Sequence, residues 1–212
     1  TTGDLIIGGA VNETAATNVI DINIAASRSL KLSGNVDIEG DIDGATAGAG
    51  ILILGHASTI DIKESIGATA SLASIVITDN LGVIFDKDIS ATTLTATGTA
   101  IVAGNVIANI GLGNDIFSHL VATSNKTITG TVSETSAVSG SDMLFHNVAD
   151  GAVIKSTITG TVAIDGADVG TTAKAGSLVL NSNATITDLD IIGGNVTAEA
   201  SQVEIKGNLI SS

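Results

Sequence analysis

The most regular chemical feature of the sequence is a set of threonine pairs with one residue between the two members. The phrase Thr-Ile-Thr-Gly-Thr-Val occupies 127–132 and returns at 157–162, thirty residues later. Four pairs share the pattern: Thr95 with Thr97, Thr127 with Thr129, Thr157 with Thr159 and Thr185 with Thr187. If the pairs stacked, their hydroxyl and methyl groups would form a flat array of the kind that orders water on ice. Because threonine also favours exposed strand positions in general, a plain strand face is the simpler interpretation and ice binding the alternative.

A calcium ligand is a second candidate. Gly111–Phe117 reads Gly-Leu-Gly-Asn-Asp-Ile-Phe and is similar to one nonapeptide of the calcium-binding β-roll repeats, in which aspartate and backbone oxygens at tight turns hold the ion. Asp115 would be the ligand. Those rolls build each site from consecutive turns, and no second copy stands nine residues away, so an ordinary corner is the simpler interpretation.

Catalytic constellations are sparse. Two aspartate pairs could chelate a cation or act as acid and base, although a solvated strand face explains them equally well: Asp86 with Asp88, and Asp188 with Asp190. The three histidines, His56, His119 and His146, have no neighbour at metal-ligand spacing, and there is no cysteine to complete a zinc site. No Gly-X-Ser-X-Gly elbow is present. We therefore expect no enzymatic activity and no cofactor, with a polysaccharide-acting β-helix enzyme as the remaining enzymatic alternative.

Composition excludes several classes of partner. The formal net charge is −14, with 22 acidic and 8 basic residues, so nucleic acid and anionic lipid would be repelled. No apolar run of eighteen residues is available to span a bilayer as a helix, and we expect no membrane insertion. Proline and cysteine are absent and only three residues are aromatic, although 44% are hydrophobic. The core must therefore be aliphatic.

Alternation of apolar and polar residues predicts short strands with one buried face. Between 29 and 42 the apolar or glycine residues share one parity and the other parity is polar: Leu30, Leu32, Gly34, Val36, Ile38, Gly40 and Ile42. Similar phrases recur at spacings of 22 residues (Leu32 to Leu54), 23 (Leu54 to Ile77) and 30 (Gly130 to Gly160). This indicates an all-β parallel β-solenoid with irregular coils of about 22–30 residues, forming one domain or a segment of a longer one over 1–212.

An antiparallel β-sandwich of jelly-roll or pilin-subunit kind is the alternative, because short strands with frequent turns suit it as well. A sandwich of different strands has no reason to reuse one phrase, which favours the solenoid. The stretch 135–148 is the least strand-like, and we expect a loop or a short helix there.

The Gly-, Asn- and Thr-rich rungs Leu30–Val36, Thr127–Val132, Thr157–Val162 and Ile191–Val196 resemble the passenger domains of bacterial autotransporter adhesins, with rickettsial surface antigens nearest in style. Bacterial surface-layer proteins share the same cysteine-free, low-aromatic composition. The resemblance is of style and rests on no diagnostic motif. It implies a right-handed parallel β-helix exported to the bacterial cell surface, with a host-surface or matrix ligand if the chain is an adhesin, and it names no active residue.

Both ends of the sequence share a pattern. Gly3–Val11 contains Leu-Ile-Ile-Gly-Gly-Ala-Val, and Leu189–Val196 reads Leu-Asp-Ile-Ile-Gly-Gly-Asn-Val. Similar terminal coils without polar caps would expose strand edges. We therefore expect each end to be covered by adjoining coils of a longer chain or by another copy, stacked end to end into a filament or layer.

Overall fold

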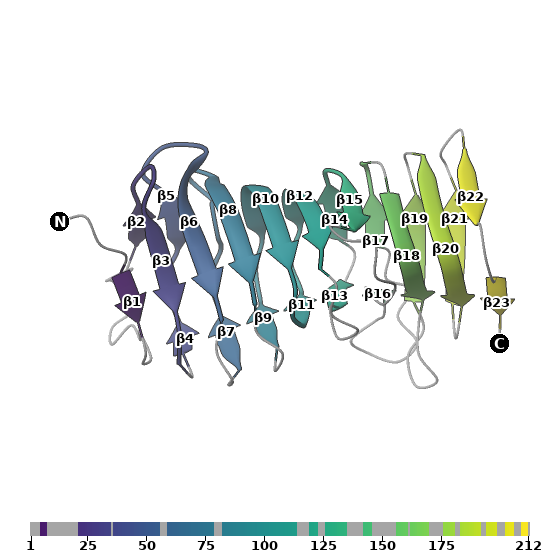
Figure 1. The fold of residues 1–212 in the computed structure, drawn as a ribbon, viewed down its shortest axis with the longest axis horizontal. Coiled ribbons are helices and arrows are strands. Elements are labelled where there is room, and N and C mark those ends of the chain that lie inside the picture. Colours follow the sequence, from purple (N-terminus) through teal and green to yellow (C-terminus); the bar gives the residue numbers. More distant parts are fainter. Residues whose placement is uncertain are drawn as a thin grey trace.

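The chain is an all-β parallel solenoid, as the sequence predicts. The computed structural model describes residues 5–7, 21–34, 36–55, 59–78, 82–113, 119–122, 126–134, 142–145, 156–160, 162–169, 176–180, 183–191, 194–198, 202–205 and 209–211. These residues form 23 strands and no helix, and every strand pairing between them is parallel. An antiparallel sandwich is therefore not the architecture. Successive coils lie side by side along the long axis, with the two termini at opposite ends (Figure 1).

The pairing register divides the strands into three faces, which we call A, B and C. Face A contains β1 (Leu5–Ile7), β3 (Ser29–Leu32), β6 (Ala49–Leu54), β8 (Leu72–Ile77), β15 (Val132–Glu134), β22 (Val203–Ile205) and parts of β10 (Ile89–Ala96), β12 (Val106–Leu112), β18 (Val162–Val169) and β20 (Ala184–Ile191). Four of these longer strands continue onto a second face.

The other two faces are built in the same way. Face B contains β4 (Val36–Ile38), β7 (Ile60–Ile62), β9 (Val83–Phe85), β11 (Ala100–Val102), β13 (His119–Ala122), β16 (Asp142–Phe145), β23 (Leu209–Ser211) and the second parts of β18 and β20. Face C contains β2 (Ile22–Ile24), β5 (Ile42–Gly44), β14 (Lys126–Thr129), β17 (Ser156–Ile158), β19 (Gly176–Leu180), β21 (Gly194–Ala198) and the first parts of β10 and β12.

Columns of stacked aliphatic side chains form the core. On face A, the in-register residues Leu30, Leu52, Ile75, Leu94, Ile110, Val132, Val162 and Ala184 are each at most 3% exposed. On face C, the corresponding column is Ile42, Ile66, Ile89, Val106, Ile128, Ile158 and Leu180. Burial of one such side chain contributes about 1.5–3 kcal/mol. The alternation seen in the sequence therefore sets which side of each strand faces inward.

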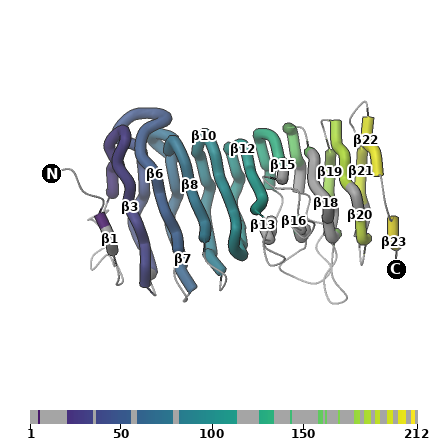
Figure 2. The backbone as a smooth tube through the Cα atoms, in the orientation of Figure 1, coloured from purple at the N-terminus to yellow at the C-terminus, as the bar shows by residue number. Residues whose placement is uncertain are grey.

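Coil length varies more than the sequence predicts. Register partners are 25 residues apart between Leu5 and Leu30 and 30 apart between Val132 and Val162, but only 16 apart between Leu94 and Ile110. The shortest coil falls below the expected 22–30 residues. It is short because β10 and β12 turn from face C to face A as continuous strands, and their pairing absorbs the corner as a register shift between Ser90 and Thr93. Figure 2 shows the backbone winding through this region.

The expectation of a loop or short helix over 135–148 is wrong for its centre. Residues Asp142–Phe145 form β16, which lies between β13 and β18 on face B, and Met143 is fully buried. The sequence Asp-Met-Leu-Phe lacks the alternation and the threonines that marked the other strands. Parallel neighbours on both sides supply its backbone partners, so tertiary pairing decides the structure here.

Candidate functional site

The polar corners of the coils are a candidate for function, because they hold most of the described carboxylates and amides on face C. Their side-chain oxygens accept hydrogen bonds from backbone N–H groups of the next coil: Asp41 from Ser65 (3.2 Å), Asp43 from Thr69 (3.0 Å), Asp88 from Asn105 (2.7 Å), Asn105 from Thr127 (3.1 Å) and Asn109 from Thr131 (3.1 Å). A buried or half-buried N–H without a partner costs free energy. These side chains therefore hold successive coils together at the corners.

This ladder gives Asp88 a structural role. The Oδ1 atom of Asp88 accepts the Asn105 backbone N–H, and both of its carboxylate oxygens lie 3.1 Å from the Asn105 side-chain amide. The backbone hydrogen bond is the main cause of a lowered Asp88 pKa. A carboxylate held ionised in this way is a poor general acid. Asp86 of the same sequence pair is exposed and, as the outward residue after β9, belongs to a different surface.

The second aspartate pair is only partly described. The side chain of Asp188 lies outside the described part of the chain. Asp190 is half-buried, and its backbone is the register partner of Asp168 in the preceding coil and of Ile210 in the following one. Parallel neighbours are about 4.8 Å apart, so this register brings two aspartate positions together that the sequence separates by 22 residues.

The four threonine pairs do not form one array. Thr127 and Thr157 are register partners on face C, as the repeat predicts. Thr95 lies on face A between Val76 and Gly111, and Thr185 lies on face A between Ala163 and Glu204. The predicted ladder is therefore split between two faces. Thr129 and Thr159 are exposed, and Thr97 donates its hydroxyl to the Ile77 carbonyl (3.0 Å); the side chain of Thr187 lies outside the described part of the chain.

The metal-site predictions fall largely outside the described residues. Asp115, His56 and His146 belong to segments that the structure does not describe, and His119 is described in its backbone alone, as the first residue of β13. Among the described residues, no group of three or more His, Cys, Asp or Glu side chains is placed to hold a metal ion.

A cluster of acidic residues around Lys63 on face B is the strongest electrostatic feature, and the sequence analysis missed it. Asp37 and Asp61 are register partners in β4 and β7. The Lys63 Nζ lies 3.4 Å from Glu39 Oε1 and 3.7 Å from Asp37 Oδ2. The hydrogen bond to Glu39 is the main cause of a raised Lys63 pKa. The signal was an aspartate between two aliphatic residues, at 37 and again 24 residues later.

Asp61 is the unfavourable member of this cluster. Its Oδ1 atom is buried and has no hydrogen-bond partner within the described part of the molecule. Desolvation is the main cause of a raised Asp61 pKa, and the nearby carboxylates of Asp86 and Asp37 raise it further, against the lowering effect of Lys63. The folded state therefore binds a proton at Asp61 more tightly than the unfolded chain does.

Replacing Asp61 with asparagine is expected to stabilise the protein at neutral pH. Because the folded-state pKa is raised above 3.8, the wild type loses this proton-linked stability as the pH rises through the raised pKa, and below 3.8 the effect disappears. Thermal melts of Asp61→Asn and wild type from about pH 3 to pH 8 should give a difference in Tm that grows with pH. Asp86→Asn should remove part of the same destabilisation. A lower Tm for Asp61→Asn at pH 7 would contradict this account.

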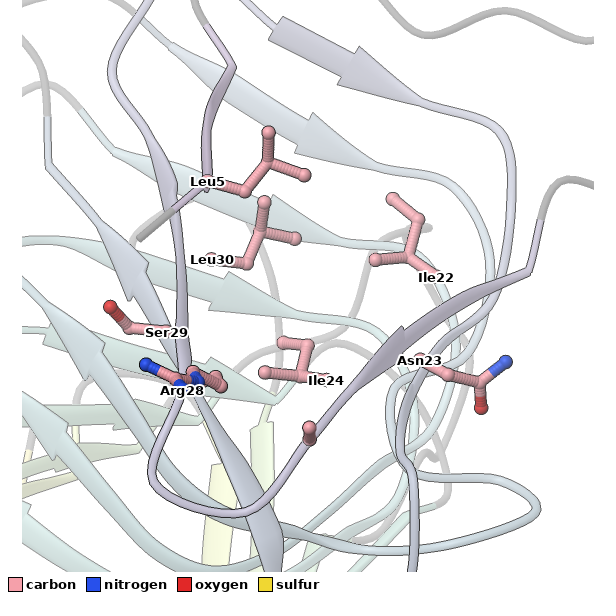
Figure 3. Close-up of a pocket in the computed structure, with 8 residues that line it drawn as sticks. Leu5, Ile22, Asn23, Ile24, Arg28, Ser29 and Leu30 are labelled. Carbon is pink, nitrogen blue, oxygen red and sulfur yellow. The ribbon is translucent and has the colours of Figure 1, made fainter. Parts of the chain in front are cut away.

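A groove of about 300 Å³ opens at the N-terminal end of the solenoid, between faces A and C. The side chains of Leu5, Leu30, Ile22 and Ile24 point into it from β1, β3 and β2, while Asn23 points away (Figure 3). Arg28 lies at the corner between β2 and β3 and supplies the groove's one described charge. The groove is the end of the aliphatic core columns, and Leu5 is 57% exposed there.

The opposite end has the same character. Leu209 and Ile210 of β23 are 61% and 53% exposed, and Val203 and Ile205 of β22 are only partly buried against the core. Within the described part, β1 pairs only with β3 and β2 only with β5 at one end, and β22 and β23 pair only with β20 at the other. Both ends thus present unpaired strand edges beside apolar side chains.

None of these features is a recognisable catalytic centre. The described residues include no helix that is long and apolar enough to cross a membrane. No protein-family model, curated protein or solved structure matches the chain.

Proposed function

We propose that the chain is a non-enzymatic structural or adhesive β-solenoid of a bacterial cell surface, and that its terminal coils are covered end to end by further β-coils. The observation that carries the proposal is the use of the corner side chains. Asp41, Asp43, Asp88, Asn105 and Asn109 all accept backbone N–H groups of the next coil. Polar groups used in this way serve the stacking of coils rather than the binding of a substrate.

The two ends support the assembly part of the proposal. Unpaired edges of parallel strands add further strands readily, and the groove at Leu5, Ile22 and Leu30 would receive the apolar side chains of another coil. The covering coils would come from a longer polypeptide or from another copy. A head-to-tail contact is heterologous, and it propagates without closing.

Light scattering and electron microscopy of the 212-residue chain, with calcium and with a chelator, test the assembly. We expect rods that lengthen along the solenoid axis as protein concentration rises, because edge pairing adds coils in one direction. A monodisperse monomer under both conditions would remove end-to-end assembly and leave an adhesin fragment or a soluble binding module as the better account.

A screen for glycan degradation tests the non-enzymatic part separately. We expect no turnover. Turnover that is abolished by Asp61→Asn or Asp190→Asn in a folded variant would show an enzyme instead.

A further inference from the structure

One long side of the solenoid carries no charge. The outward residues of face A from β6 to the start of β15 alternate with the buried core column and are all neutral: Ile51, Ile53, Ser74, Val76, Thr93, Thr95, Asn109, Gly111, Thr131 and Ser133. We call this set the uncharged face. The same coils carry Asp61, Lys63 and Asp86 on face B, and Asp43 and Asp88 on face C. In a chain of net charge −14, this segregation leaves one side that a partner can cover without burying a charge.

The hydroxyl groups of the uncharged face are already bonded within the molecule. Thr93 donates to Ser74 Oγ (3.1 Å), and Thr131 donates to Asn109 Oδ1 (3.1 Å). At the edge of the same face, Thr78 and Thr97 donate to the carbonyls of Leu54 (3.4 Å) and Ile77 (3.0 Å). Covering the face would therefore leave these donors satisfied, and their methyl groups would face the partner. Such a surface costs little to desolvate.

The shape of the face matches itself. Along one register column the outward residues run Ile53, Val76, Thr95, Gly111 and Ser133, from bulky at one end to small at the other. A second copy turned by a two-fold rotation about Thr95 places the bulky half on the small half. Ile53 then lies opposite Ser133, and Val76 opposite Gly111, so two sheets can pack at even thickness. The rest of each copy, which is strongly acidic, would repel at closer contact elsewhere.

We propose that two copies of this chain associate side by side through the uncharged face, as a closed dimer with a two-fold axis near Thr95. Five coils at about 4.8 Å and six residues at about 3.3 Å give roughly 480 Å² per copy. The total is close to the lower limit for a specific interface, so the dimer is weak and reversible. Salt strengthens it, because screening reduces the repulsion between two acidic chains. The inference uses the long side of the solenoid and does not rest on the proposed contact between its ends.

Sedimentation equilibrium on the full chain, from about 10 μM to about 1 mM at low and moderate salt, tests the dimer. We expect wild type to reach a dimer and no larger species through this contact, with more dimer at moderate salt. Thr95→Asp and Thr95→Lys should each be monomeric, and an equimolar mixture of the two should recover the dimer, since opposite charges then meet at the axis. Thr129→Asp is the matched control, because Thr129 is exposed on face C, and it should dimerise like wild type.

The outcomes separate this contact from others. Thermal melts of all variants should match wild type, so that loss of the dimer is not loss of the fold. A wild type that stays monomeric to the highest concentration, or a Thr95→Asp variant that dimerises unchanged, would overturn the inference. Monomeric wild type that inhibits ice recrystallisation, with inhibition lost in Thr95→Lys, would also overturn it and give the face to ice. Open-ended rods that persist in Thr95→Asp would belong to the end-to-end contact.

Discussion

Replacing Ile158 with aspartate is expected to destabilise the solenoid by more than about 4 kcal/mol, enough to unfold a marginally stable domain. Ile158 is 1% exposed and stacks between Ile128 and Leu180 in the face C column. An ionised carboxylate at this position would have no partner in an aliphatic stack. Urea unfolding followed by circular dichroism measures the loss, and Val132→Asp, at a position 0% exposed on face A, should behave alike.

The matched control is the next residue along the chain. Thr159 is exposed, and its backbone N–H donates to the Ile128 carbonyl (2.9 Å), a bond that aspartate keeps. Thr159→Asp should change the free energy of unfolding by less than about 1 kcal/mol. If Thr159→Asp and Ile158→Asp lowered the urea midpoint equally, the assignment of inward and outward residues on this strand would be wrong.

Replacing Gly160 with alanine is expected to have the second largest effect, a loss of at least about 3 kcal/mol. A Cβ atom at Gly160 would overlap the carbonyl group of Gly130 in the preceding coil. Gly130 itself has φ +137°, and a Cβ there would overlap the carbonyl of Ala108. The obstacle at both positions is backbone, which cannot rotate aside as a side chain can. The two coils would have to separate, and the flanking hydrogen bonds would lengthen.

Gly48→Ala separates steric overlap from backbone preference. Gly48 also has a positive φ, +76°, but a Cβ there meets nothing within 4 Å. It should lose only the cost of a left-handed alanine, about 1–2 kcal/mol. Thermal melts of Gly48→Ala, Gly130→Ala and Gly160→Ala would compare the three. A loss at Gly160 no larger than that at Gly48 would show that the coils are not packed this closely.

The sequence alone predicted the fold class because side-chain parity is a local property. Ile158 and Val162 fall on one parity and Thr157 and Thr159 on the other, and a strand with one buried face allows a single assignment. The repeat of Thr-Ile-Thr-Gly-Thr-Val after thirty residues predicted that Thr127 and Thr157 are neighbours, and they are register partners. The glycine within that repeat is explained by the close approach of Gly130 and Gly160.

Only the tertiary structure decided which face each residue occupies. The face depends on how many residues the chain spends at each corner, and the coils range from 16 to 30 residues. Equal spacing of threonine pairs therefore did not place Thr95 and Thr185 beside Thr127. In the same way, β16 forms because its neighbours pair with it, and the raised pKa of Asp61 follows from the carboxylates of Asp37 and Asp86 in the adjoining coils. Parity is fixed by adjacent residues, whereas register and desolvation are fixed by the coils above and below.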